Sequence, residues 1–580
     1  MIKKLCRSIR EYKTPSILAP LCVSMEVVLE VTIPFMMSFL IDKGIQSENG
    51  VNLNVVLKYG GIIVFLACIS LLFGALSGRF SAKASAGFAK NLRKDMYYAV
   101  QNFSFSNIDK FSTSSIITRL TTDVNNVQMA YQMIIRVAVR SPLMLTFALV
   151  MAAGINRKLA LIFLSIVPIL GGGLIFIAAK AHPVFEKVFD TYDKLNNVVQ
   201  ENLRGVRVVK AFVREKEEKE KFGGVSNTIY KLFVKAERML AFNGPLMQFS
   251  IYFCMIMLSW VGAHFVVDGK LTPGQLTTFT TYTMQILMSL MMISMIFVMI
   301  IISRASAERI VEILEEKPDL AQPENPVFDV KDGSIRFENV GFAYSKKRNK
   351  LCLKNINLDI KSGETVGIIG GTGSSKSTLV QLISRIYDTT EGEVYVGPQN
   401  VKDYDLESIR DAVSMVLQKN VLFSGTIKEN MRWGNENATD EEIKEACTLA
   451  CADEFIETFK EGYDTYIEQG GANVSGGQRQ RLCIARALLK KPKVLVFDDS
   501  TSAVDTRTDS RIREALKTAI PGTTKIFIAQ RISSVMDADK IIVMESGEIN
   551  AIGTHSELLE NNEIYKEVYY SQVKGEDDNG

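Results

Sequence analysis

Long apolar stretches constrain this chain more than any other feature of its sequence. Each stretch is near or above the roughly 20 residues that an α-helix needs to cross a bilayer. They cover approximately residues 15–41, 55–76, 137–155, 159–179, 246–267 and 276–302. The chain has 580 residues, of which 47% are hydrophobic, which is too long for one core and too apolar for an ordinary soluble protein. We therefore expect an α-helical transmembrane domain of about six spans over residues 1–316.

The basic residues favour one orientation of these spans. They crowd the segments after the second and fourth spans, whereas residues 43–54 carry few of them. The crowded positions include Lys83, Lys90, Arg93, Lys94, Arg204, Arg207, Lys210 and Arg214. By the positive-inside rule, both chain ends are cytoplasmic and the protein lies in the cell membrane. The net charge of +3 is small, so the sequence predicts no nucleic-acid partner.

Two carboxylates stand out inside the first apolar stretch. Glu26 and Glu30 are one helical turn apart and therefore share one face of the helix. A carboxylate at membrane depth is costly and by default faces a cavity or a partner. Glu26 and Glu30 form either a site for a cationic or polar substrate or a structural bond to Arg136 or Arg140. The sequence leaves both alternatives open.

A methionine stripe marks the last apolar stretch. At about 100° per residue, its members fall within one arc of the helix. They are Met284, Met288, Met291, Met292, Met295 and Met299. Thioethers suit surfaces that accept apolar ligands of different shapes, but ordinary helix packing explains such a stripe as well.

A second domain follows the spans. Residues 317–332 contain Pro318, Pro323 and Pro326 among several acids and read as a linker. Strand and helix signals then alternate over residues 333–572, which predicts an α/β domain with an antiparallel portion near its start. Residues 573–580 form a polar tail.

A phosphate-binding loop lies near the start of this domain. The apolar run 365–369 precedes Gly370, Gly371, Thr372, Gly373, Ser374, Ser375, Lys376, Ser377 and Thr378, and a helical pattern follows. In a P-loop, backbone amides and the lysine hold phosphates, and the hydroxyl after the lysine reaches Mg²⁺. Ser375 stands where glycine is expected, so we expect a strained backbone there.

A second anion-binding feature and an acidic pair lie farther along the chain. Ser475, Gly476, Gly477 and Gln478 immediately precede a helical pattern, where free N–H groups attract an anion. The apolar run 494–497 predicts a strand buried on both faces. Asp498 and Asp499 follow at its carboxyl end, where ligands of open α/β sheets bind.

In this order and spacing, these motifs resemble the nucleotide-binding domain of ATP-binding cassette (ABC) transporters. The resemblance covers essentially the whole chain, as an exporter half-transporter, and implies ATP and Mg²⁺ as cofactors. It implies that Tyr344 stacks on adenine, that Gln418 and Asp498 join Ser377 at Mg²⁺, and that residues 502–505 form a loop at a dimer interface.

Two cytoplasmic segments also resemble motifs of this exporter family. Residues 118–124 and 201–212 are similar to its cytoplasmic-loop motifs, which implies short coupling helices nearby that press on nucleotide-binding domains. From the residues alone, charged and solvated helix faces are the simpler interpretation.

Two residues depart from the family pattern. Asp499 occupies the position of a catalytic glutamate, and its carboxylate should fall about 1 Å or more short of the attacking water, a misplacement that can cost about 10²-fold in rate. Gln530 occupies the position of a histidine that contacts the γ-phosphate. The chain's own ATP site is thus expected to bind ATP but to hydrolyse it poorly.

Residues 474–478 match the signature motif of this family without a departure. In this family the signature of one cassette completes the ATP site of the other. We expect a heterodimer with a second half-transporter, in which Ser475, Gly477 and Gln478 serve the partner's ATP. The predicted function is ATP-driven export of small amphipathic drug-, lipid- or peptide-like molecules. A regulatory subunit that binds ATP without transporting, and a homodimeric lipid or peptide exporter, are the alternatives.

Overall fold

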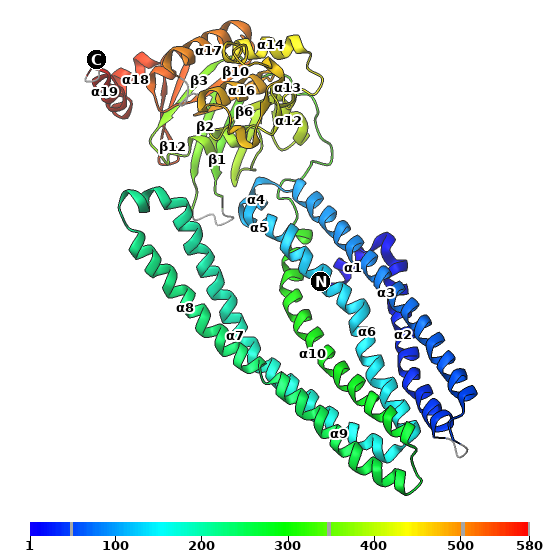
Figure 1. The fold of residues 1–580 in the computed structure, drawn as a ribbon. Coiled ribbons are helices and arrows are strands. Elements are labelled where there is room, and N and C mark those ends of the chain that lie inside the picture. The colour runs from blue at the N-terminus through cyan, green and yellow to red at the C-terminus, as the bar shows by residue number, and fades with distance from the viewer. Residues whose placement is uncertain (47–49, 345–349, 500–504, 578–580) are drawn as a thin grey trace. The chain divides into compact units, whose positions relative to one another are not determined.

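A computed structural model describes residues 1–46, 50–344, 350–499 and 505–577. The chain divides into two compact units (Figure 1). The first comprises Met1–Asn102 and Phe111–Glu316, and the second comprises Phe103–Lys110 together with the residues from Lys317 onward. Each unit is described by itself.

The first unit consists of helices. They are α1 (Ile2–Arg7), α2 (Lys13–Leu40), α3 (Leu53–Gln101), α5 (Thr113–Thr118), α6 (Val124–Ile155), α7 (Arg157–Ala211), α8 (Glu215–Leu240), α9 (Asn243–Val267) and α10 (Pro273–Glu315). A 3-10 turn η1 (Arg10–Tyr12) and the π-helical turns η2 (Ile41–Ile45) and η3 (Arg119–Asp123) join some of them. Within the described residues, 6 helical segments are long and apolar enough to cross a membrane, which confirms the predicted number of spans.

Local sequence signals fix where two of these helices begin. The Asn52 side chain accepts a hydrogen bond from the Val55 N–H at the start of α3. Thr272 and Gln275 form a reciprocal capping box at the start of α10, and Pro273 takes the first helical position. Such caps satisfy backbone donors that would otherwise lack partners.

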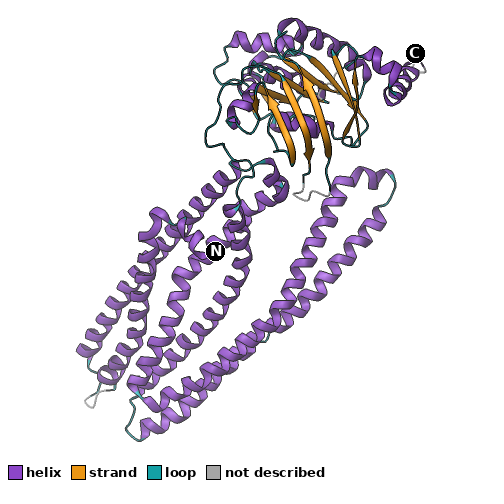
Figure 2. Ribbon diagram, turned by 180° about the vertical axis from the view of Figure 1, so that it is seen from behind, coloured by secondary structure: helices purple, strands orange, loops and turns teal. Residues whose placement is uncertain are grey.

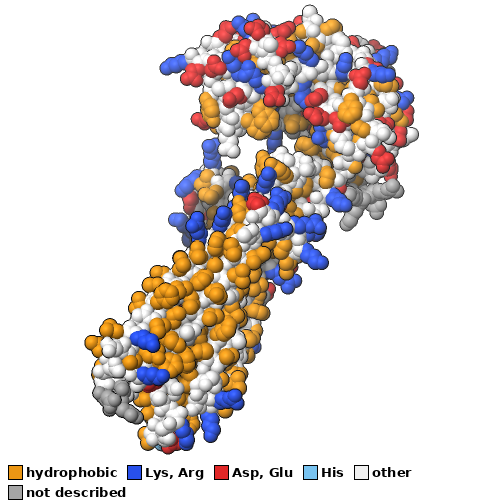
Figure 3. All heavy atoms as spheres, turned by 90° about the vertical axis from the view of Figure 1, so that its right-hand side faces the viewer, with side chains coloured by type: hydrophobic (Ala, Val, Ile, Leu, Met, Phe, Trp, Pro, Cys, Tyr) orange, Lys and Arg blue, Asp and Glu red, His pale blue; other side chains and the backbone are white. Residues whose placement is uncertain are grey.

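The surface of the first unit is largely apolar. No more than 35% of the most hydrophobic window of any described span is buried within the chain. Figure 3 shows hydrophobic side chains over much of the exposed surface of the long helices. Because water does not favour an apolar surface of this extent, lipid or a second protein must cover it.

The second unit is built on β-sheets (Figure 2). Its strands are β1 (Ile335–Phe342), β2 (Leu353–Ile360), β3 (Thr365–Gly370), β4 (Glu391–Val396), β5 (Gln399–Asn400), β6 (Val413–Val416), β7 (Gly425–Thr426), β8 (Tyr466–Ile467), β9 (Val494–Asp498), β10 (Thr524–Ile528), β11 (Lys540–Glu545) and β12 (Glu548–Gly553). A 6-stranded sheet has the order β12-β11-β3-β10-β9-β6, and a 4-stranded sheet has the order β2-β1-β4-β5. The second sheet is antiparallel, as predicted for the start of this domain.

Helices and short turns complete the second unit. The helices are α4 (Phe105–Phe111, most of which belongs here), α11 (Lys376–Ile383), α12 (Leu406–Ala412), α13 (Ile427–Arg432), α14 (Asp440–Leu449), α15 (Asp453–Ile456), α16 (Gly476–Leu488), α17 (Thr506–Ala519), α18 (His555–Asn561) and α19 (Glu563–Asp577). The 3-10 turns are η4 (Gly462–Asp464), η5 (Gln469–Gly471) and η6 (Ile532–Ser534).

The strand β9 is buried on both faces, as its unbroken apolar run predicts. Leu495 and Phe497 belong to one hydrophobic cluster, whereas Val494 and Val496 belong to another. Successive side chains of a strand point to opposite faces, so the two clusters lie on the two sides of the sheet. This burial leaves only the carboxyl end of β9 free to carry polar residues toward a ligand.

Candidate functional site

The candidate site lies where neighbouring parallel strands end. Strands β3, β10, β9 and β6 pair side by side in parallel, so their carboxyl ends meet at one edge of the sheet. Gly370, Asp498, Gln530 and Gln418 lie at or just beyond those ends. Segments far apart in the sequence thus supply one site, at the edge where α/β sheets bind ligands.

The loop between β3 and α11 has a backbone that few side chains tolerate. Gly370 has φ +154°, and a Cβ atom there would approach the Met544 carbonyl oxygen to 2.2 Å. Gly373 has φ +85°. Ser375 adopts the left-handed region with φ 70° and ψ 26°, which confirms the strain predicted for a serine at a glycine position.

The Lys376 side chain forms hydrogen bonds with atoms of this loop. Its Nζ atom donates to the carbonyl oxygens of Gly370 at 2.8 Å and Gly371 at 2.9 Å, and to Ser374 Oγ at 3.3 Å. Burial lowers the pKa of Lys376, and the nearby Asp499 and Asp498 carboxylates partly offset this effect. A partly buried ammonium group at the first turn of α11 gives the loop a positive centre suited to phosphate.

Ser377 and Asp498 form the second polar pair. The Ser377 hydroxyl donates to Asp498 Oδ1 at 2.7 Å, and Asp498 is 4% exposed. Burial raises the pKa of Asp498, and the neighbouring Asp499 carboxylate raises it further, whereas the Ser377 hydrogen bond lowers it. No cluster of three or more His, Cys, Asp or Glu side chains suited to a metal occurs among the described residues. One carboxylate beside one hydroxyl fits Mg²⁺, which takes few protein ligands and fills its shell with phosphate and water.

The two residues that depart from the family pattern contact each other. Gln530 Nε2 donates to Asp499 Oδ2 at 2.8 Å, and Gln418 Nε2 approaches the same oxygen at 3.4 Å. Asp499 has φ 48°, and its N–H donates to the Ile528 carbonyl oxygen at 3.1 Å. Two side-chain amides therefore converge on one oxygen of the Asp499 carboxylate.

Gln572 of α19 holds the backbone around Gln530, a role that no sequence motif predicts. Its Nε2 atom donates to the Gln530 carbonyl oxygen at 2.8 Å, and its Oε1 atom accepts from the Ile532 N–H at 2.9 Å. The contact joins residues 42 positions apart, so no local motif announces it. The helix α19 thereby fixes the loop that carries Gln530.

Tyr344 lies beside the P-loop helix α11. Its hydroxyl lies 3.0 Å from Thr378 Oγ1 on α11, and the Tyr387 ring meets its ring edge to face at 5.3 Å. Tyr344 is 50% exposed, so its ring keeps a surface on which a planar base can stack. Burial raises the pKa of Tyr344, so this phenol stays neutral at physiological pH.

The segment 103–110 also contacts this part of the second unit. The Tyr387 hydroxyl donates to Asp109 Oδ2 at 2.8 Å, and Asn107 Nδ2 donates to the Lys317 carbonyl oxygen at 3.1 Å. A short helix that precedes the 118–124 motif is therefore anchored in the unit that holds the candidate site.

The signature residues form the start of α16. Ser475 Oγ accepts from the Gln478 N–H at 3.2 Å, and Gln478 Oε1 accepts from the Ser475 N–H at 2.9 Å. This capping box leaves Ser475 and Gly476 exposed at the positive end of the helix. Residues 502–504 of the predicted interface loop lie outside the described residues, whereas Asp505 caps α17 through the Thr508 N–H.

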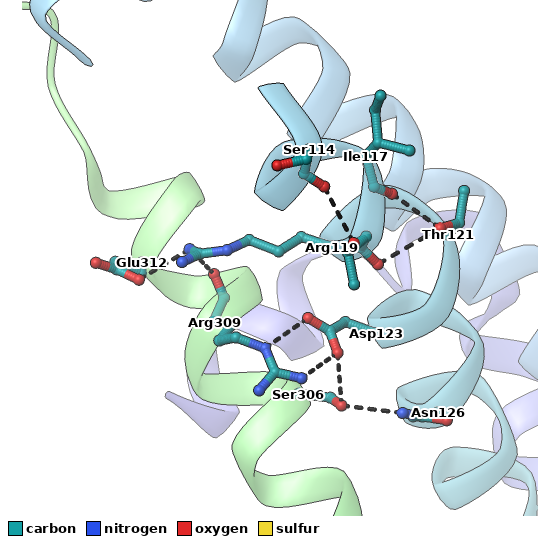
Figure 4. A network of polar contacts seen from close by, with 10 residues as sticks. Ser114, Ile117, Arg119, Thr121, Asp123, Asn126, Ser306, Arg309 and Glu312 are labelled. Carbon is teal, nitrogen blue, oxygen red and sulfur yellow. Dashed lines mark hydrogen bonds and ion pairs between the residues drawn. The ribbon is translucent and has the colours of Figure 1, made fainter. Parts of the chain in front are cut away.

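The two charged residues of the 118–124 motif, Arg119 and Asp123, are buried in a polar network (Figure 4), whereas its three threonines are exposed. Asp123, which is 0% exposed, accepts from Arg309 of α10, with Nε to Oδ2 at 2.8 Å, and from Ser306 Oγ at 2.9 Å. Arg119 donates to the Arg309 carbonyl oxygen and to Glu312 Oε2, both at 2.8 Å. For these two charged residues the solvated-face interpretation is wrong, because the network ties the motif to the last spanning helix. The second motif, 201–212, is mostly exposed within this chain.

The intramembrane carboxylates have a partner. Arg140 of α6 donates to Glu26 Oε1 at 2.7 Å and to Glu30 Oε2 at 2.7 Å. Of the two alternatives left open by the sequence, the structural bond is therefore present, and it is made by Arg140. The methionine stripe is different, since Met284, Met288, Met291, Met292 and Met295 are 41% to 58% exposed within the chain. Packing among the described residues does not cover the stripe.

Together, a set of membrane-spanning helices and a P-loop α/β unit on one chain define an ATP-driven membrane transporter. Comparison with known families agrees. Residues 16–291 match the family described as "ABC transporter transmembrane region", and residues 353–502 match the family described as "ABC transporter".

Individual relatives cover nearly the whole chain. The uncharacterized ABC transporter ATP-binding protein YfiB of Bacillus subtilis is 35% identical over 94% of both chains. An ATP-dependent lipid A-core flippase of Desulfotalea psychrophila is 30% identical over 99% of both. The structure of a bacterial Atm1-family ABC exporter with ATP bound has the same fold, with a TM-score of 0.83 at 24% identity, covering 97% of this chain and 99% of that one. The chain belongs to the ABC transporter family, as an exporter half-transporter that carries its transmembrane and ATP-binding domains in one polypeptide.

Proposed function

We propose that this half-transporter is one subunit of a heterodimeric exporter of small amphipathic molecules whose own ATP site is degenerate. It resides in the cell membrane with both termini in the cytoplasm. Drug-, lipid- and peptide-like molecules are the substrate classes, and the lipid named for the Desulfotalea psychrophila relative supports the lipid class. The basic residues after the second and fourth spans support the orientation.

In this proposal the nucleotide site uses the residues of the sheet edge. The loop amides of residues 370–375 and the Lys376 ammonium hold the phosphates, and Tyr344 stacks on the base. Ser377, Asp498 and Gln418 hold Mg²⁺. When bound, ATP with Mg²⁺ supplies the free energy of hydrolysis that drives export.

The observation that carries the degenerate site is the bond between Asp499 and Gln530. A general base must be within hydrogen-bond reach of the proton that it abstracts. The Asp499 carboxylate is one methylene shorter than a glutamate and is already engaged by the Gln530 amide at 2.8 Å. Gln530 in turn offers an amide donor where a histidine is expected, and an amide does not titrate near neutral pH.

The start of α16 supports the heterodimer. Its capping box leaves the helix amides of residues 475–478 ordered at an exposed, positive helix end. The signature residues are intact, whereas Asp499 is a weakened acid. The signature can then support hydrolysis only in the site of a partner that supplies its own P-loop, glutamate and histidine. The competent site then consists of those partner groups and of Ser475, Gly476, Gly477 and Gln478 of this chain.

Two other functions are separated by ATPase measurements on purified protein. A regulatory subunit would bind ATP in the pair without supporting export of any amphipathic probe. A homodimer would hydrolyse ATP slowly without a second chain. We expect little turnover by this chain alone and a large increase on addition of a partner that bears the glutamate and histidine. Normal turnover by the chain alone would refute the degenerate site.

We also propose the division of the chain into a transmembrane domain (1–316), a linker (317–332), an ATP-binding cassette (333–572) and a polar tail (573–580). The end of α10 at Glu315 and the start of β1 at Ile335 support the first two boundaries.

A further inference from the structure

Arg136 is a charged residue inside a spanning helix. Its N–H donors form no hydrogen bond with the described residues. It lies on α6 one helical turn before Arg140, within the candidate span Thr113–Ile155. Arg136 is partly buried and forms no ion pair or hydrogen bond with any residue that the structure describes. Its guanidinium carries five N–H donors, and a cation at membrane depth is costly without a partner. An anion is therefore needed beside it.

Arg140 cannot share its carboxylates easily. It donates to Glu26 Oε1 at 2.7 Å and to both carboxylate oxygens of Glu30, at 3.0 Å and 2.7 Å. Both acids are thus already paired with one arginine. A cationic substrate, one of the alternatives for Glu26 and Glu30, would have to compete with Arg140 for them. With Arg136, the two carboxylates and two arginines are neutral overall, and Arg136 is the member whose donors have no partner among the described residues.

One acceptor near Arg136 is also unfilled. Glu26 is 8% exposed, and its Oε2 atom is buried with no hydrogen-bond partner within the described chain. A buried acceptor without a partner is unfavourable, and a donor on a ligand would remove that cost. The headgroup that fits this place therefore carries a donor as well as a negative charge.

Two glycines of α3 place these groups side by side. An ideal Cβ at Gly74 would lie 3.5 Å from Glu26 Oε2, and one at Gly78 would lie 3.7 Å from Arg136 Nη1. Gly74 and Gly78 are one helical turn apart and so lie on one side of α3. The unfilled acceptor and the unused cation are thus neighbours along one smooth stripe of backbone.

We propose that Arg136 and Glu26 form a headgroup site for an amphipathic anion, in which Arg136 binds a phosphate or carboxylate and Glu26 Oε2 accepts a hydrogen bond from an ammonium or hydroxyl of the same headgroup. This inference rests on the proposed export of amphipathic molecules and narrows their class. The apolar part of such a ligand would lie among the spanning helices that surround the site.

The test measures binding alone, by calorimetry on the full-length protein in dodecyl maltoside with its partner subunit and without nucleotide. The probes are dodecyl phosphate, dodecyl trimethylammonium, and the pair dodecylphosphoethanolamine and dodecylphosphocholine, of which only the former carries N–H donors. We expect dodecyl phosphate to bind and the ammonium probe not to bind. Arg136→Gln should weaken dodecyl phosphate at least about tenfold, as for loss of charge-assisted hydrogen bonds.

The matched control is Arg79→Gln, because Arg79 of α3 is exposed and likewise has no partner among the described residues. It should leave binding within about twofold of the wild type, the scatter expected of an exposed charge without partners. Glu26→Gln should abolish the preference for the ethanolamine probe over the choline probe while sparing dodecyl phosphate. Equal losses in the Arg136 and Arg79 variants, or equal binding of the anionic and cationic probes, would overturn the site.

Inorganic phosphate separates the sources of the anion. If millimolar inorganic phosphate displaces dodecyl phosphate fully, the site binds a free anion. If dodecyl phosphate stays bound, the site binds an amphiphile. The proposed degenerate ATP site plays no part in this measurement. If the degenerate ATP site were refuted, the binding result would still hold. If the headgroup site were refuted, the proposal of a degenerate ATP site would be unaffected.

Discussion

The two ends of the segment 473–505 differ in how their polar groups are used. At the start of α16, Ser475 and Gln478 satisfy each other, and the helix end stays exposed. At the end of β9, Asp499 is engaged by Gln530 from within the same chain. One end keeps the Gly476 and Gly477 amides outside its capping box, and the other has an acceptor that is already occupied.

This difference supports our proposal that the two ends serve different nucleotides. The Gly476 and Gly477 amides lie outside the capping box, at a helix end of the kind that binds anions. A carboxylate held by a neutral amide is poorly placed to activate water. In the proposal, the same short segment takes part in catalysis at a partner's site and in binding at its own.

The largest effect is expected at the signature. Gly477→Asp puts a negative charge at the helix end where the partner's phosphates would bind, so ATP turnover of the heterodimer should fall about 10²-fold or more. The measurement is steady-state phosphate release by the purified pair. Unchanged turnover would show that this helix end serves no competent site.

The matched substitution in the P-loop should be milder. Lys376→Ala removes the ammonium that lies 2.8 Å and 2.9 Å from two loop carbonyls. ATP binding at this chain's own site should weaken, but turnover of the pair should fall by less than about tenfold, because the other site performs the chemistry. If Lys376→Ala costs more than Gly477→Asp, the assignment of the two ends is reversed.

Restoring the family residues should raise activity at the chain's own site. Asp499→Glu together with Gln530→His returns the longer acid and the titratable ring, and turnover there should rise about 10-fold to 10²-fold. The partner's glutamate is replaced by glutamine so that the remaining signal comes from this site. No increase in the double variant would mean that side-chain reach is not the limiting defect.

A smaller effect is expected from the α19 contact. Gln572→Ala removes two hydrogen bonds to the backbone around Gln530, so ATP affinity at this site should change by about 2-fold to 10-fold. Ser571→Ala on the same helix is the control, because among the described residues the Ser571 hydroxyl donates only to the Val568 carbonyl oxygen, within α19. Gln572→Glu keeps the acceptor for the Ile532 N–H and should recover part of the loss. Equal behaviour of the Ser571 and Gln572 variants would leave α19 without a role at the site.

The smallest effect concerns pH. Because burial and the neighbouring Asp499 raise the pKa of Asp498, this carboxylate is protonated earlier than an ordinary aspartate as the pH falls. The Mg²⁺ concentration needed for ATP binding should therefore rise on acidification. Asp499→Asn removes a like charge, lowers the pKa of Asp498 and should move this rise to lower pH. A titration of the Mg²⁺ dependence from neutral pH downward checks both statements.

Local sequence signals predicted most of the fold. Apolar length alone gave the spans, and the glycine spacing gave the loop at Gly370–Ser375, including the left-handed Ser375. These features depend on neighbours in sequence, which is why a single chain reveals them. The separation of the two hydrophobic clusters by β9 followed from its unbroken apolar run in the same way.

Contacts between residues that are distant in the sequence could not be predicted from it. Gln572 meets Gln530 only because α19 packs beside η6, and Arg140 rather than Arg136 meets Glu26 because of how α6 turns against α2. The burial of Arg119 and Asp123 depends likewise on the position of α10. A sequence states which residues are charged but not which charge will be paired, and the unpaired Arg136 is visible only in three dimensions.

The most direct test of the account follows nucleotide bound to the heterodimer during a single turnover. The pair is loaded with ATP labelled at the adenine, with azido-ATP crosslinking to assign each nucleotide to a chain. The account predicts that the nucleotide on this chain's P-loop remains ATP while that on the partner's becomes ADP. Conversion of both nucleotides at equal rates would contradict it.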